Sequence, residues 1–143
     1  MQVRHILRDK GSEVISITSD ATLSEAARLL ASKRIGALVV RERDGSLAGI
    51  LSERDIVRAV AQASVNALPQ PVSQYMTRSV ATCCDDDSVD GLMEMMTHGR
   101  FRHVPVIEDD RIIGLVSIGD VVKTRISETV MEAESLRAYI AAG

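Results

Sequence analysis

The chain has 143 residues, of which 45% are hydrophobic, and this suits one compact domain with a real core. A net charge of −3 argues against a nucleic-acid binder, which would need a basic face for phosphate contacts, and an aromatic content of 2% argues against base stacking. The N-terminus lacks the apolar core of a signal peptide, no run reaches the length of a membrane span, and the two cysteines are adjacent, so we expect a reduced, cytoplasmic location.

The first half of the chain predicts a short N-terminal arm and then a strand–helix–strand–strand–helix unit. Apolar residues at helical spacing favour a helix over residues 2–9 of the arm, which covers residues 1–13. Thr22 and Glu25 form a capping box at the start of the first helix of the unit, and residues 44–45 (Asp-Gly) are typical of a hairpin turn. The elements of this unit, residues 14–62, are a strand at 14–17, a helix at 23–33, strands at 37–40 and 47–51, and a helix from Ser52.

The second half repeats this order after a linker at residues 63–78. The second unit covers residues 79–126. The tail at residues 127–143 has apolar residues partly at helical spacing, which favours a C-terminal helix that packs on the body or on a second subunit. The elements of the second unit are a strand around 80–83, a helix at 89–98, strands at 104–107 and 112–116 with a turn at 109–110 (Asp-Asp) between them, and a helix from Ser117.

The two units are copies of one another. At a shift of 66 residues Arg34 aligns with Arg100, and after the loss of one residue in a turn Asp55 aligns with Asp120 at a shift of 65. Each half is marginal for independent folding, so we expect the two to share a core. Two similar halves can pack about a pseudo-twofold axis, which makes two equivalent clefts at the seam, and we expect the function there.

Four segments carry a resemblance to a known family. They are the segment 101–106 (FRHVPV), the strand-to-helix turns 49–55 (GILSERD) and 114–120 (GLVSIGD), and residues 75–77 (YMT) before the second unit. This ordered set resembles the cystathionine-β-synthase (CBS) domain, paired as a Bateman module, over nearly the whole chain. It is most similar to stand-alone bacterial two-repeat signal-transduction proteins.

The resemblance implies a fold, a ligand and a partner. The fold is α+β, with two β-α-β-β-α repeats about a pseudo-twofold axis. The ligand is an adenine nucleotide, most often AMP, ADP or ATP, while some members hold S-adenosylmethionine or NAD. The partner is a second copy, because family members pair into a flat homodimer through helix faces, here with apolar residues such as Ile56, Val60, Met95 and Val121.

Asp55 and Asp120 allow two interpretations. Each follows a serine by three residues at the expected start of a helix, where a carboxylate caps the helix and suits its dipole. From the residues alone, capping and ligand binding are equally good explanations. The resemblance places the ribose-binding carboxylate at this position, and such a group can accept bonds of about 1.5–3 kcal/mol from each ribose hydroxyl.

By the geometry of the family, each cleft takes residues from both repeats. One cleft would contain Ile15, Ile35, Gly36, Ala37, Ser117, Gly119 and Asp120. The other would contain Ser52, Arg54, Asp55, Ala81, Phe101, Arg102 and His103. The base would lie against apolar side chains.

Arg102 and His103 are the expected phosphate contacts, although two solvated residues beside a strand are the ordinary alternative. Weaker candidates are Lys33, Arg34, Arg54 and Arg100. Because Gly36 and Ala37 stand in the first repeat where the second has Arg102 and His103, we expect the Asp55 cleft to be the more cationic.

No other constellation predicts chemistry. Cys83, Cys84, His98 and His103 lack the spacing of a metal site, and no nucleophile–base set is present, so we expect no metal and no catalysis. The sequence therefore predicts a regulatory module that binds an adenine nucleotide, AMP first, and senses energy or redox state. The rival is a protein–protein interaction scaffold whose clefts are filled by side chains, and an enzyme is a more distant alternative.

Overall fold

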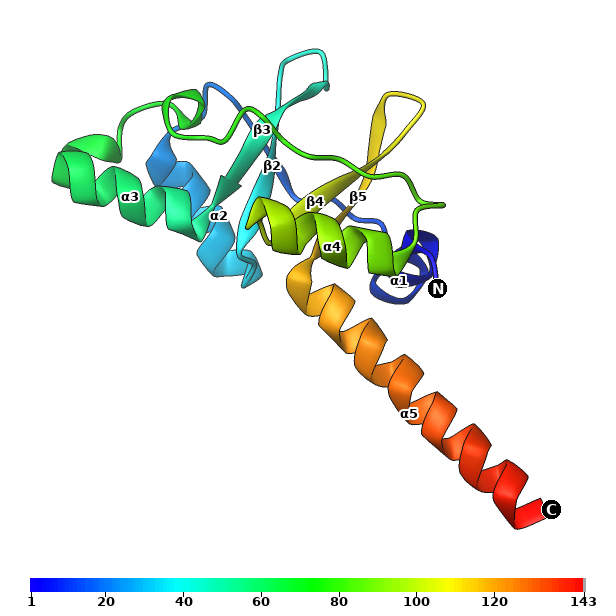
Figure 1. The fold of residues 1–143 in the computed structure, drawn as a ribbon. Coiled ribbons are helices and arrows are strands. Elements are labelled where there is room, and N and C mark those ends of the chain that lie inside the picture. The colour runs from blue at the N-terminus through cyan, green and yellow to red at the C-terminus, as the bar shows by residue number, and fades with distance from the viewer. Residues whose placement is uncertain (143) are drawn as a thin grey trace.

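The computed structural model describes residues 1–142 as two α+β repeats joined by a linker (Figure 1). The first part contains α1 (Val3–Lys10), β1 (Ser16–Thr18), α2 (Leu23–Lys33), β2 (Ala37–Arg41), β3 (Leu47–Ser52) and α3 (Glu53–Ala63). The linker holds two short 3₁₀ helices, η1 (Ser64–Ala67) and η2 (Val72–Gln74). The second part contains α4 (Val89–Gly99), β4 (His103–Glu108), β5 (Arg111–Ser117) and α5 (Ile118–Ala142).

Each repeat is built on a small sheet. In the first repeat, β2 lies between β1, to which it is parallel, and β3, to which it is antiparallel. In the second, β4 and β5 form an antiparallel hairpin whose turn residues Asp109 and Asp110 both have positive φ, as the tight turn requires. This confirms the predicted hairpin and its turn.

The strand predicted at residues 80–83 is wrong. Only a parallel bridge between Cys83 and Val106 stands where β1 stands in the first repeat. The chain leaves the sheet directly afterwards, because the Cys84 N–H donates to Asp87 Oδ2 (2.7 Å) and the Asp85 carbonyl accepts the Arg4 N–H (2.8 Å). Cys83 is therefore the last residue that pairs with β4, and before it Val80 and Ala81 line the space between the two repeats.

Local signals position α2 and α4 as expected. The capping box of α2 is formed, with Glu25 N donating to Thr22 Oγ1 (3.1 Å) and Thr22 N donating to Glu25 Oε2 (3.3 Å). Arg34 and Arg100, which the duplication aligns, end α2 and α4 in the left-handed conformation (φ 55° and 57°). The two repeats therefore turn from helix into sheet in the same way.

The buried side chains form two clusters rather than the shared core that we expected. The first repeat packs on linker residues such as Val72 and Met76. The second repeat packs on Val3, Ile6 and Leu7 of α1, so the N-terminal arm covers the repeat that is farther along the chain. Each half gains the apolar surface that it lacks from a flanking segment, not from a common centre.

One continuous helix, α5, runs from the second repeat through the predicted C-terminal tail. Its first turns pack on the repeat, and the remainder extends away from the body (Figure 1). Val121, which we expected at a partner-facing surface, is instead fully buried in the core of its own repeat. No helix among residues 1–142 combines the length and the apolar character that crossing a bilayer requires.

Candidate functional site

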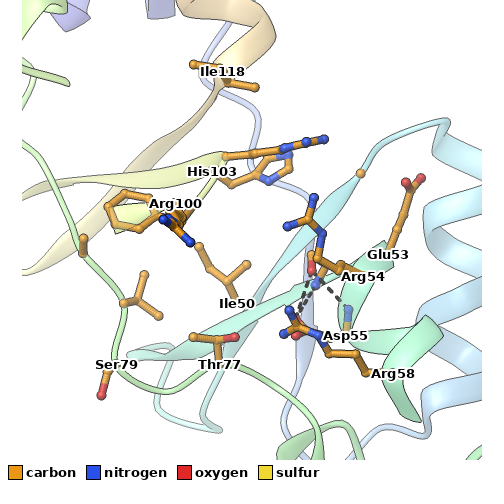
Figure 2. Close-up of a pocket in the computed structure, with 16 residues that line it drawn as sticks. Ile50, Glu53, Arg54, Asp55, Arg58, Thr77, Ser79, Arg100, His103 and Ile118 are labelled. Carbon is orange, nitrogen blue, oxygen red and sulfur yellow. Dashed lines mark hydrogen bonds between the residues drawn. The ribbon is translucent and has the colours of Figure 1, made fainter. Parts of the chain in front are cut away.

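A cavity of about 450 Å³ lies at the seam between the two repeats (Figure 2). The structure brings together here all seven residues that were expected around Asp55, namely Ser52, Arg54, Asp55, Ala81, Phe101, Arg102 and His103. The remaining lining residues are Gly36, Ile50, Glu53, Arg58, Thr77, Ser79, Val80, Arg100 and Ile118. Both repeats and the linker end therefore contribute walls to a single space.

The Asp55 carboxylate both caps α3 and lies on the wall of this cavity. Asp55 Oδ2 accepts hydrogen bonds from Ser52 N (2.9 Å) and Ser52 Oγ (3.1 Å), and Asp55 N donates to Ser52 Oγ (3.3 Å). Within residues 1–142, both bonds that reach this carboxylate end on Oδ2, so Oδ1 can accept from a ligand. The capping interpretation is correct, and it is compatible with ligand binding.

The cavity is cationic although the chain as a whole is acidic. Four arginines, Arg54, Arg58, Arg100 and Arg102, face two carboxylates, Glu53 and Asp55. Arg54 and Arg58 stand one helical turn apart on α3, whereas Arg100 approaches from the end of α4 (Figure 2). This excess of positive charge can bind an anionic group such as a phosphate.

Arg58 is a cavity residue that the motif analysis missed. Its signal was present in the sequence, because a residue four positions after Arg54 on a helix lies on the same face. The lining residues Thr77 and Ser79 were missed because they lie where the linker meets the second repeat, and no spacing rule places that junction against a cleft.

His103 lies half-buried at the start of β4, between the cavity and the first turn of α5. Burial lowers the pKa of His103, and the Lys10 charge lowers it further, against the opposing charges of Asp120 and Glu53. The imidazole is therefore neutral near pH 7, where one ring nitrogen can donate and the other accept.

Asp120, the second predicted acid, binds a lysine as well as its capping serine. Asp120 Oδ2 accepts from Ser117 N (2.9 Å), as the helix cap requires, and also from the Lys10 ammonium (2.7 Å). Burial raises the pKa of Asp120, but the hydrogen bonds from Lys10 and Ser117 outweigh it and leave the pKa below its usual value. Within residues 1–142, both bonds to this carboxylate also end on Oδ2, so the two acids differ by the Lys10 ammonium, which lies beside the carboxylate that we expected to meet a ribose.

The grouping of the other residues expected around Asp120 remains a prediction. Gly36, assigned to that cleft, lies instead on the Asp55 cavity, where a Cβ at this position would stand 3.6 Å from the His103 ring. Ile15 and Ile35 pack against the core of the first repeat, and Ala37 is buried in β2. Gly119 follows Ile118 in the first turn of α5, beside Ser117 Oγ.

The two cysteines are not among the residues that line the Asp55 cavity. Cys83 is buried, and burial raises the pKa of its thiol to about 12, with the Asp87 and Cys84 charges adding to the effect. Within the described residues 1–142, no three His, Cys, Asp or Glu side chains are close enough to hold a metal ion.

Comparison with known proteins agrees with the fold. The CBS domain matches residues 3–62 and 72–127, and the chain therefore belongs to the CBS-domain family, as a tandem pair. The mitochondrial CBS domain-containing protein CBSX3 of Arabidopsis thaliana is 34% identical over 99% of this chain and 72% of its own length. The chain spans 25% of the length of another Arabidopsis relative, CBSCBSPB5, at 30% identity over 97% of this chain.

Solved structures extend this comparison to a bound ligand. The CBS-domain protein ATU1752 of Agrobacterium tumefaciens superposes with a TM-score of 0.85 at 48% identity, over 87% of this chain and 92% of its own. The CBS domain pair of MJ0100, crystallised with 5′-methylthioadenosine and S-adenosyl-L-methionine, superposes with a TM-score of 0.80 at 29% identity, over 90% and 98% of the two chains. The architecture described above is thus one that holds adenosine compounds in a relative.

Proposed function

We propose that this chain is a non-catalytic regulatory CBS pair that binds an adenine nucleotide, with AMP as the first candidate, in the Asp55 cavity. One observation carries the proposal: a helix-capping carboxylate with a free oxygen and four arginines line the same cavity between the repeats. Adenosine compounds in the MJ0100 relative support the choice of ligand.

The cavity provides a place for each part of the nucleotide. A ribose hydroxyl would donate to Asp55 Oδ1, and the phosphate would lie among the arginines. The base would lie against Ile50, Val80 and Ala81, which give the cavity an apolar lining. A volume of about 450 Å³ is within the range of small-molecule sites and suits a mononucleotide. ADP, ATP and NAD share the adenosine part and are the alternatives.

A regulatory role follows from the position of the ligand between the two repeats. Because the cavity takes walls from both repeats, a bound nucleotide would shift their relative arrangement to the extent that it prefers one arrangement over another. A change in the AMP to ATP ratio, or in NAD, would then be reported to a partner protein. The proposal places the protein in the cytoplasm, as a homodimer, in agreement with two free thiols.

Titration calorimetry with AMP, ADP, ATP, NADH and S-adenosylmethionine tests the ligand. We expect Asp55→Asn to abolish binding and Asp120→Asn to retain it. The two acids occupy equivalent cap positions, so the second variant is a matched control for lost capping. If none of the compounds binds the wild-type chain, the nucleotide proposal is wrong and the interaction-scaffold alternative stands.

A further inference from the structure

The outer part of α5 carries apolar side chains that no other part of residues 1–142 covers. Leu136 is 60% exposed and Ile140 is 67% exposed, and Ile126, Val130 and Tyr139 are exposed as well. Ile126 and Val130 lie beside α4, whereas Leu136, Tyr139 and Ile140 belong to the C-terminal end of the helix, which extends away from the two repeats (Figure 1). A contiguous exposed apolar surface of this kind marks an interaction site rather than ordinary solvent-facing helix.

The apolar and small residues of this helix follow a heptad pattern. They recur at alternating steps of four and three residues, at Val122, Ile126, Thr129, Ala133, Leu136 and Ile140. The one polar member fits the pattern, because the Thr129 hydroxyl donates to the Arg125 carbonyl (3.0 Å) and is satisfied within its own helix. This spacing keeps a single seam on one side of the helix, as a coiled coil requires.

We propose that a second copy of this chain covers this seam, with the two α5 helices parallel and in register. The seam begins inside an apolar groove of about 300 Å³ between α4 and α5, lined among others by Met93, Val122 and Ile126. A partner helix along the seam would therefore also close the groove. Pairing through α5 does not depend on nucleotide binding.

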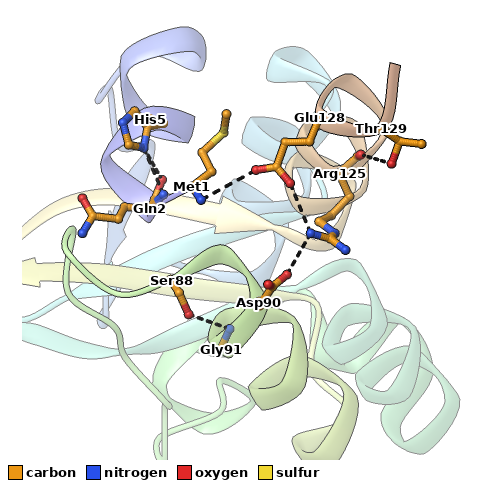
Figure 3. Close-up of polar contacts among 9 residues, drawn as sticks. All are labelled: Met1, Gln2, His5, Ser88, Asp90, Gly91, Arg125, Glu128 and Thr129. Carbon is orange, nitrogen blue, oxygen red and sulfur yellow. Dashed lines mark hydrogen bonds and ion pairs between the residues drawn. The ribbon is translucent and has the colours of Figure 1, made fainter. Parts of the chain in front are cut away.

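Charges beside the seam select the parallel arrangement. In a parallel pair Glu132 of one copy meets Arg137 of the other, and the twofold axis makes this contact twice. In the antiparallel register that buries the same six residues, Lys123 of one copy would face Arg137 of the other, which sets two like charges against each other. Arg125, near the start of the seam, is bound within its own chain to Asp90 (3.0 Å) and Glu128 (3.2 Å) (Figure 3).

Single-cysteine cross-linking tests the register. In a Cys84→Ser background, which removes the exposed native thiol, we expect Ala133→Cys to form an interchain disulfide on mild oxidation. Glu134→Cys, the adjacent position off the seam, is the control and should stay monomeric on a denaturing gel. An Ala133→Cys chain that cross-links only to a Thr129→Cys chain would show antiparallel pairing and overturn the proposal.

Sedimentation tests the surface itself. We expect Leu136→Glu to raise the dimer dissociation constant at least tenfold, because it places two like charges in the seam, whereas Ser135→Glu should leave the constant unchanged. Leu136 lies outside both core clusters, so an unchanged thermal unfolding midpoint of the diluted protein shows that the variant is folded. A wild-type chain that is monomeric throughout the micromolar range, or a dimer that Leu136→Glu leaves intact, overturns the proposal.

Discussion

The Lys10 ammonium lies 2.7 Å from Asp120 Oδ2 and also donates to the Leu115 carbonyl at 2.7 Å. This contact joins the end of α1 to the first turn of α5 across 110 positions of sequence. The carboxylate of Asp55, the duplicate of Asp120, has only Ser52 as a hydrogen-bond partner among residues 1–142. The duplication makes these two acids equivalent, but the N-terminal arm gives Asp120 an ion-pair partner that the Asp55 carboxylate lacks within residues 1–142.

Removal of Lys10 should make the second acid available. In Lys10→Met we expect an additional, weaker nucleotide-binding event, because the Asp120 carboxylate then loses the ammonium group that lies beside it and keeps only the bond from Ser117 N. The pair is partly exposed, so the free energy of unfolding should fall by only about 0–1 kcal/mol. Calorimetric stoichiometry measures the first effect and urea denaturation the second. Lys33→Met, an exposed lysine at the end of α2, is the control, and a single binding event in Lys10→Met would contradict the prediction.

His103 should make stability depend on pH. Its folded-state pKa lies below the ordinary value of 6.5, so the unfolded chain binds the proton more readily. The stabilisation is then fully present above pH 6.5 and is lost as the pH falls toward the folded-state pKa. Urea denaturation of the ligand-free protein at a series of pH values should show this slope, and His103→Gln should reduce it. His98→Gln is the control, and equal slopes for wild type and His103→Gln would refute the assignment.

The equivalent glycines Gly49 and Gly114 should respond differently to alanine. A Cβ at Gly49 would clash with the backbone carbonyl of Thr77, which is bound to Ile50 N (3.0 Å), whereas a Cβ at Gly114 meets the flexible end of Leu7 at 2.5 Å. We expect Gly49→Ala to lower the free energy of unfolding by about 1–3 kcal/mol and Gly114→Ala by less. Thr77 also lines the cavity, so Gly49→Ala alone should weaken nucleotide binding. Equal losses in the two variants would show that the carbonyl can move as easily as the leucine.

The arginines should recognise the phosphate and not the nucleoside. Arg58→Ala or Arg100→Ala should weaken AMP binding by about tenfold to a hundredfold, as the loss of one charge-assisted bond implies. Adenosine, which has no phosphate, should bind both variants as it binds the wild type. Calorimetry with the two ligands separates these effects, with the exposed Arg28→Ala as the control. An equal loss for AMP and adenosine would place the arginines away from the phosphate.

Interactions within a few residues were accessible from the sequence. The duplication, the capping box at Thr22 and Glu25, and the turn at Asp109 and Asp110 depend only on spacing and on the conformations that these residues prefer. The family resemblance added the seam, and the seven residues expected beside Asp55 do line one cavity there. Fold class and the principal cleft were thus predictable.

Contacts between distant segments were decided only by tertiary structure. The arm could have packed on either repeat, and its docking on the second repeat brings Lys10 to Asp120 and makes the duplicated clefts unequal. The packing of whole elements also buries Val121, which we expected on the surface, and places Gly36 on the Asp55 cavity rather than beside Asp120. A helical or strand period specifies which residues share a face, but the surface that a face meets depends on how whole elements pack, and no local spacing encodes that choice.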